Sequence, residues 1–158
     1  MPELRELLSG AGFGDVQTYV QSGNVVLSSG DAPSDVACAC GQLIAAELGL
    51  ELDVVVRTRV ELATVVARDP FGDVAANPKR YQVTFLASEL EPATARRVEE
   101  AAAGDERVHV AGREVYAWHP AGVGRSKLAT LLSGRSLGVP ATARNWTTVT
   151  ALLALAGE

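Results

Sequence analysis

The residues with the most distinctive chemistry surround Arg144, in a segment from Thr142 to Thr148 that reads Thr-Ala-Arg-Asn-Trp-Thr-Thr. Either Thr142 or Asn145 can cap a following helix through its side-chain oxygen, and Trp146 can anchor that helix in a core. Arg144 would then lie beside a helix N-terminus, where exposed N–H groups and the helix dipole favour an anion and a guanidinium adds a bidentate donor. The segment predicts either a binding site for phosphate or carboxylate, or a structural tie between arginine and a carboxylate.

A second segment places Ser126 and Lys127 at the start of another predicted helix, directly after the loop Gly122–Arg125. A glycine-rich loop that leads into a helix N-terminus can hold phosphate. The spacing differs from the phosphate-loop motif, which needs Gly-x-x-x-x-Gly-Lys-Ser/Thr after a strand. The alternative interpretation is a solvated loop in which Ser126 only caps the helix.

A third segment, Gln21-Ser22-Gly23-Asn24, joins two strand-like runs. Serine, glycine and asparagine are typical of a tight hairpin connection. A joint selected only for turn formation would not need Gln21. The segment is therefore either a well-formed turn, or a turn that also presents the hydrogen-bonding groups of Gln21, Ser22 and Asn24 at the end of a sheet.

We expect Arg144 to share one anion-binding pocket with Ser126 and Lys127. Their two helix starts are close in sequence, joined by the loop 134–141, and would converge if the two helices packed side by side in the same direction. A short connection can instead make the helices antiparallel. The full set of candidate ligand-binding residues is Arg144, Lys127, Ser126, Asn145, Gln21, Ser22 and Asn24.

Other kinds of site find little support. Cys38 and Cys40 are two residues apart on a predicted helix and point to different sides, so they neither chelate a metal nor pair well. No carboxylate or cysteine stands at a convincing ligand spacing from His109 or His119, so we expect no metal and no cofactor. A Gly-x-Ser-x-Gly nucleophile motif and paired catalytic carboxylates are also absent from the sequence. The catalytic residues, if the protein is an enzyme, stay unknown.

Composition narrows the class of protein. The 158 residues are 47% hydrophobic and 21% charged, which suits a folded chain with an aliphatic core. The net charge of −5 counts against a general nucleic-acid binder, because phosphate contacts favour a basic balance. No apolar run approaches the roughly 20 residues that span a bilayer, and the N-terminus reads as an amphipathic helix rather than a signal peptide. With no disulfide framework, we expect a cytoplasmic protein.

The elements that must position these residues form two similar series. In the first half, periodicity and turn residues predict helices at 2–8, 33–48 and 60–68 and strands at 16–20, 25–28 and 52–58. In the second half they predict strands at 81–87, 107–111 and 114–118 and helices at 92–103, 126–132 and 145–156. The stretch Gly72–Pro78 is the best linker candidate, since it holds Gly, Asn and Pro with little periodicity.

The element order indicates a duplication. The second half reads β-α-β-β-α-α, and the first half reads the same way as far as β-α-β-β-α once one opening strand is placed ahead of it. This predicts an α+β fold of two similar two-layer units, each an antiparallel sheet with helices on one face, at residues 1–73 and 78–158, although one compact globule is also possible. The comparison rests on element order, since the halves share little sequence. The exposed edge left by an absent opening strand would invite pairing with a second copy, giving a homodimer.

Four segments carry a family resemblance: Thr18–Val26, Pro78–Tyr81, Gly124–Leu128 and Thr142–Val149. In this order and at these separations, the chain resembles the bacterial domain-of-unknown-function family 1697 over essentially its whole length. The resemblance implies a two-part α+β fold and no established activity. Members typically open with an apolar strand and an Arg-Gly-Ile-Asn-like loop ahead of the first helix, whereas the given sequence begins at the helix.

Three functions remain open at this stage. The first is binding of, or enzymatic action on, a small phosphate- or carboxylate-bearing ligand at a polar site between the two units. The second is a nucleic-acid-associated protein in which the same basic groups are joined by Tyr81 or Trp118 as stacking faces. The third is a protein-interaction domain with no small ligand. The acidic balance counts against the second function, and the clustering of polar motifs at element junctions counts against the third.

Overall fold

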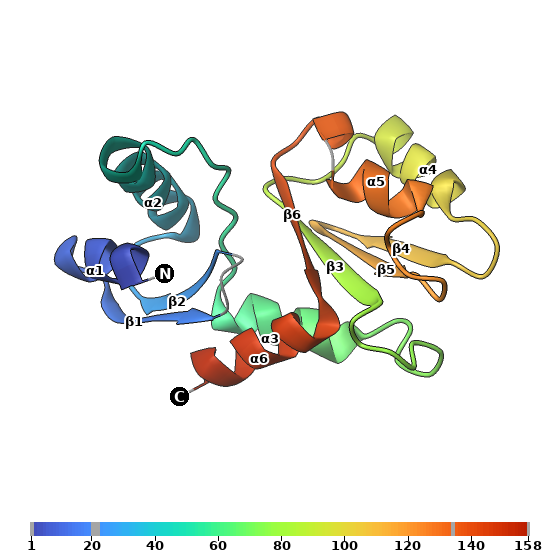
Figure 1. The fold of residues 1–158 in the computed structure, drawn as a ribbon, viewed down its shortest axis with the longest axis horizontal. Coiled ribbons are helices and arrows are strands. Elements are labelled where there is room, and N and C mark those ends of the chain that lie inside the picture. Colours follow the sequence, from blue (N-terminus) through green and yellow to red (C-terminus); the bar gives the residue numbers. More distant parts are fainter. Residues whose placement is uncertain (1, 20–22, 134, 158) are drawn as a thin grey trace.

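The computed structural model describes residues 2–19, 23–133 and 135–157, and its mixture of helices and antiparallel sheets confirms the predicted α+β class. Figure 1 shows two units side by side, with α3 and α6 packed together beneath them. The first half contains α1 (Pro2–Gly10), β1 (Gly14–Tyr19), β2 (Asn24–Ser28), α2 (Pro33–Leu48) and α3 (Arg59–Arg68). None of the described helices is both long and apolar enough to cross a bilayer.

The second half forms a four-stranded antiparallel sheet in the order β4-β5-β3-β6. Its elements are β3 (Tyr81–Leu86), α4 (Pro92–Ala101), β4 (Arg107–Ala111), β5 (Glu114–Trp118), α5 (Lys127–Ser133), a short 3-10 helix η1 (Arg135–Leu137), β6 (Ala141–Asn145) and α6 (Trp146–Ala156). Strand β6 is absent from the sequence-based prediction, because Ala-Thr-Ala-Arg-Asn has one β-branched residue, Thr142, and no aromatic residue to mark a strand. Leaving aside η1, the second unit therefore reads β-α-β-β-α-β-α rather than β-α-β-β-α-α.

Both faces of the second sheet are apolar, and helices cover both. Val115 and Ala117 of β5 face α4 and α5 and pack with Val98 and Leu128. Residues on the other face of the sheet, such as Tyr116, pack with α3 and α6. Successive residues of a strand point to opposite faces, so a strand apolar at every position must be covered twice. The prediction of helices on one face describes α4 and α5 but leaves out α3 and α6.

The first unit has a two-stranded sheet, and its core packs side chains of α1 and α2 against β1 and β2. Residues 52–58, predicted as a strand, are extended but have no strand assignment. Their side chains still alternate as in a strand, since Val54 and Val56 pack toward α1 and α2 while Val55 packs toward α3. The prediction is wrong in pairing rather than in backbone shape, because no described strand lies alongside to share its hydrogen bonds.

The two helices beneath the sheets begin in the same way. Thr58 caps α3 in a capping box with Glu61, and Asn145 caps α6 by accepting a hydrogen bond from the Thr148 N–H. Both capping residues have φ −73° and ψ 163°. Of the two residues predicted as possible caps of this helix, Thr142 and Asn145, it is Asn145 that caps it. Trp146 stacks on Tyr81 with ring centroids 4.6 Å apart, which anchors the start of α6 on the sheet.

Candidate functional site

Arg144 lies in β6, one residue before the cap of α6, and reaches from the second unit to the first. Its Nε donates to the Asn24 side-chain oxygen at 2.6 Å, and Asn24 begins β2. Its Nη1 donates to Thr142 Oγ1 at 2.5 Å and to the Ala143 carbonyl at 2.8 Å. These three contacts are all to neutral oxygens. Asn24 is itself buried and donates to the Tyr19 carbonyl, so the guanidinium is held in a fixed place.

Burial lowers the pKa of the Arg144 guanidinium below its ordinary value. Arginine stays charged at any physiological pH, so the shift reports how much hydration the cation has lost. A partly dehydrated cation attracts an anion more strongly than an exposed one does, because the local dielectric is lower. Arg144 is therefore well suited to hold phosphate or carboxylate.

A cavity of about 630 Å³ lies against Arg144, at the junction of the two units. It is lined by β2, by the extended segment 52–58, and by apolar side chains of α1, α2 and α6. Asn24, Thr142 and Arg144 line it together. This size is within the usual range for ligand pockets. The cavity is thus lined by a cation, Arg144, and otherwise largely by apolar side chains.

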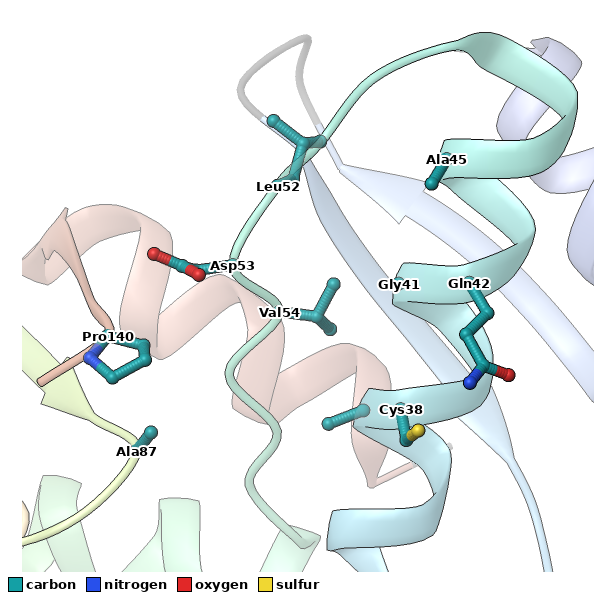
Figure 2. A pocket seen from close by; sticks show the side chains of 10 residues that line it. Cys38, Gly41, Gln42, Ala45, Leu52, Asp53, Val54, Ala87 and Pro140 are labelled. Atoms are coloured by element: carbon teal, nitrogen blue, oxygen red, sulfur yellow. The ribbon is translucent and has the colours of Figure 1, made fainter.

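A second, smaller hollow of about 350 Å³ lies between α2 and residues 52–54 (Figure 2). Figure 2 shows Val54 pointing toward α2 and Asp53 pointing the other way, toward Pro140. Gln42 and Cys38 are its other polar lining residues, and none of the described residues that line it is a cation. This hollow does not have the chemistry to hold an anion.

Ser126 and Lys127 lie elsewhere. The Ser126 hydroxyl donates to the Glu106 carboxylate at 2.5 Å and accepts from the Ala129 N–H at 3.0 Å. Ser126 therefore caps α5, which was the alternative to phosphate binding in the sequence analysis. Lys127 is exposed. Arg144 is paired with Val83 and faces α3 and α6, whereas α5 covers the other face of the sheet. The structure thus does not bring Arg144 together with Ser126 and Lys127, because the missed strand β6 turns Arg144 to the opposite side.

Ser126, His119 and Glu106 form a polar cluster that superficially resembles a catalytic triad. His119 Nδ1 lies 2.7 Å from Glu106 Oε2 and 3.3 Å from Ser126 Oγ. In a working triad the serine and the carboxylate contact different ring nitrogens, whereas here both contact Nδ1. His119 Nε2 is buried with no hydrogen-bond partner among the residues that the structure describes, and the His119 side chain is fully shielded from solvent. The cluster holds the fold together rather than presenting a nucleophile.

We expect Glu106→Gln to destabilise the protein by about 1–3 kcal/mol at neutral pH, the usual range for hydrogen bonds to a charged group. Burial raises the pKa of the Glu106 carboxyl, but hydrogen bonds from Ser126, His119 and the Ala103 N–H outweigh burial and leave it lowered. A lowered pKa means that the carboxylate stabilises the fold above its ordinary pKa, and that this contribution is lost as pH falls through the lowered pKa. Urea unfolding between pH 3 and 7 should show a shallower acid dependence in Glu106→Gln. Parallel pH profiles would contradict this assignment.

Of the four remaining candidates, the structure describes two, Asn24 and Asn145. Asn24 meets Arg144 directly, as a group presented at the end of a sheet. Asn145 is occupied as a helix cap. Gln21 and Ser22 lie outside the described residues. Within the described ranges, no group of His, Cys, Asp and Glu side chains could hold a metal ion.

Sequence reasoning missed Arg57, which is the counterpart of Arg144 in the first unit. Each arginine directly precedes the cap of a helix on the same core, Thr58 for α3 and Asn145 for α6. Arg57 crosses to the second unit and bonds Glu114, the first residue of β5, just as Arg144 crosses to Asn24, the first residue of β2. The sequence does contain the pattern, since an arginine precedes each capping residue, in Arg57-Thr58 and Arg144-Asn145. The two arginines can be recognised as equivalent only when β6 is known to precede Asn145.

The chain has an α+β fold in which Arg57 and Arg144 reach across between its two halves, with a cavity against Arg144. The chain matches the family described as "Protein of unknown function (DUF1697)" over residues 1–116, and it belongs to that family. Its structure is similar to "conserved bacterial protein SP0830 from Streptococcus pneumoniae", with a TM-score of 0.77 and 17% identity, over 99% of this chain and 88% of that chain. This likeness shows the fold alone. No curated protein matches the chain.

Proposed function

We propose that the protein binds a small ligand bearing a phosphate or carboxylate group in the cavity between its two units, and that Arg144 holds the anionic group. The observation that supports this proposal most directly is the placement of Arg144 on the wall of a cavity of about 630 Å³, bonded to the neutral oxygens of Asn24 and Thr142. The cation is partly buried, lines a ligand-sized space and is held by hydrogen bonds, which are features that favour anion recognition.

The comparison with Arg57 sharpens the proposal. Arg57 meets the carboxylate of Glu114 at 2.9 Å, and both side chains are nearly buried, with 6% and 12% of their surface exposed. At the equivalent position opposite Arg144 the chain has Asn24, a neutral amide. Arg57 thus shows that an arginine before a helix cap on this core can hold a carboxylate in a nearly buried place. The equivalent placement of Arg144 beside a cavity supports the proposal that it can hold the anionic group of a ligand.

We also propose a cytoplasmic location, which the two free cysteines, Cys38 and Cys40, favour. Two alternative functions remain predictions that rank below anion binding: association with nucleic acid, and interaction with another protein without a small ligand. The acidic balance of the chain continues to count against nucleic acid.

The experiment is a titration of inorganic phosphate and of acetate into the wild-type protein while its thermal stability is followed. An anion held at about a hundred times its dissociation constant should stabilise the protein by roughly 2.7 kcal/mol. Arg144→Gln should abolish this response. Arg97→Gln is the matched control, because Arg97 also donates to a backbone carbonyl, that of Ser136, but lies on the exposed surface of the second unit.

A second variant makes the test independent of lost stability. Asn24→Asp places a carboxylate beside the Arg144 guanidinium, in the manner of Glu114 and Arg57. We expect this variant to be at least as stable as the wild type and to lose its response to added anions, because the new carboxylate would compete with an added anion for the guanidinium. Anion stabilisation of equal size in wild type, Arg144→Gln and Asn24→Asp would refute the proposed site.

A further inference from the structure

We propose that the protein forms a symmetric dimer in which β4 of one copy pairs antiparallel with β4 of a second copy. This pairing joins two four-stranded sheets into one sheet of eight strands. The inference goes beyond the proposed function and does not depend on it. It follows from which edge of the second sheet is open, from the direction of the backbone groups along that edge, and from the charges beside it.

Strand β4 is the open edge of the second sheet. The strand order β4-β5-β3-β6 makes β4 and β6 its two edges, and Figure 1 shows β6 on the side that faces the first unit. Strand β6 is also obstructed, because Arg144 donates to the Ala143 carbonyl and Pro140, just before the strand, lines a hollow with α2. Among the described residues, no backbone hydrogen bond reaches β4 from any element other than β5.

The β4 edge lacks the features that usually keep edge strands from pairing, which are proline, lysine and bulges. Its sequence is Arg-Val-His-Val-Ala, and its pairing with β5 continues without a register shift. By contrast, the pairing of β1 with β2 shifts between Gly14 and Gln17. Strand β4 is therefore a regular edge to which another strand can add.

The turn after β4 decides which of its backbone groups point outward. Gly112 and Arg113 connect β4 to β5 as a two-residue hairpin loop, and Gly112 has φ 57°. The pair that closes such a loop, here Ala111 and Glu114, exchanges both of its backbone hydrogen bonds. The backbone groups of Ala111 therefore point toward β5.

The hydrogen bonds of an antiparallel pair alternate along each strand. The backbone N–H and C=O groups of Arg107 and His109 therefore also point toward β5, while those of Val108 and Val110 point outward. An antiparallel pair of β4 strands centred at His109 places Val108 of one copy opposite Val110 of the other. Outward-pointing groups then meet outward-pointing groups on both sides of the two-fold axis.

This register uses the whole strand and opposes no like charges. Every residue of β4 finds a partner, with Arg107 opposite Ala111 and His109 opposite its own copy. Like charges directly across a sheet are destabilising, and the pairing avoids them. Each His109 ring leans on Tyr116 of its own sheet, with ring centroids 6.2 Å apart.

Charges in the flanking turns favour the same register. Asp105, in the turn before β4, is exposed, and Arg113, in the turn after it, keeps 41% of its side chain exposed although it pairs with Glu61. Antiparallel pairing about His109 brings Asp105 of each copy beside Arg113 of the other, so two opposite-charge contacts form. A shift by two residues would instead set Arg107 against Arg113. Charge complementarity therefore selects a second copy of the chain as the occupant of this edge.

The first test is sedimentation of the wild-type protein from about 10 µM to 1 mM, where a weak dimer becomes measurable. Val108→Pro removes an outward N–H without removing a bond to β5, and proline is tolerated at such edge positions. We expect it to raise the dissociation constant at least about tenfold, since the two-fold axis doubles the loss. Val108→Thr is the matched control, because it keeps the N–H and the branched shape, and it should dimerise as the wild type does.

A charge exchange makes the test independent of any loss of stability. Asp105→Arg turns both contacts between copies into pairs of cations, and Arg113→Asp turns them into pairs of carboxylates, so neither variant should self-associate. In a mixture of the two variants, both contacts join a cation to a carboxylate. We expect the mixed dimer to bind at least about tenfold more tightly than either variant binds itself.

Amide exchange followed by nuclear magnetic resonance identifies the edge. Raising the protein concentration should protect the amides of Val108 and Val110 and leave that of His109 unchanged, because His109 is already bonded to β5. A wild-type protein that stays monomeric at about 1 mM would overturn the inference. Equal dimerisation of Val108→Pro and Val108→Thr, or association that protects β2 in place of β4, would overturn it as well.

Discussion

Replacing Glu114 by alanine should lower the free energy of unfolding by about 3–5 kcal/mol, the range for breaking one partner out of a buried ion pair. The carboxylate meets Arg57 Nε at 2.9 Å, and the Arg57 side chain is only 6% exposed. Without Glu114, the guanidinium stays buried between the Leu86 and Arg113 carbonyls with no countercharge at that position. Urea unfolding of wild type and variant at neutral pH measures the loss.

The matched control is Arg113→Gln. Arg113 pairs with Glu61 across the same boundary between the units, but these side chains are 41% and 34% exposed. An exposed pair contributes at most about 1 kcal/mol, since water and salt screen it. If Glu114→Ala lowers the free energy of unfolding no more than Arg113→Gln does, the buried Arg57 does not need the Glu114 carboxylate as its partner.

The amide hydrogens of β2 should exchange with solvent far faster than those of β3, by about a hundredfold or more. Strand β3 pairs on both sides and carries fully buried Val83 and Leu86, so its amides should open only with the whole protein. Strand β2 belongs to a two-stranded sheet, which is marginal by itself and opens locally. A hundredfold ratio corresponds to about 2.7 kcal/mol between the two opening free energies.

Native-state hydrogen exchange read by mass spectrometry, with peptides covering β2 and β3, makes the comparison in one sample. The α2 amides are an internal reference for the first unit, because a sixteen-residue helix satisfies its own backbone hydrogen bonds. Equal exchange of β2 and β3 would show that the first sheet is no less stable than the second, and would weaken the view of β2 as an open edge.

The fold was predictable from sequence wherever local signals agreed with their surroundings. Helix α2 begins at Pro33 and ends before Gly49, whose φ of 67° suits glycine, and both boundaries follow from residue type alone. The hairpin of β4 and β5 likewise follows from Gly112 between two apolar runs. Strand β6 escaped detection because its pairing with β3 compensates for a sequence of weak strand preference.

The candidate site was half predictable for the same reason. Arg144 and Asn24 were each identified by their unusual neighbourhoods, yet they are 120 positions apart and their contact depends on how the two units pack. The convergence expected for Arg144, Ser126 and Lys127 relied on nearness in sequence. The direction of a side chain on a strand is decided by its register, and a strand that is not recognised has no register.

Helix α3 packs in the core of the second half of the protein, and this affects what would happen if the chain were cut between the halves. This helix belongs to the first half of the sequence, but Leu62 and Val65 pack in the core of the second sheet, beside α6. Arg57 and Arg144 tie the halves together in both directions. The connection at residues 72–78 is therefore not what keeps the halves associated. A protease that cut there would leave two fragments held by noncovalent contacts, each completing a core that the other began.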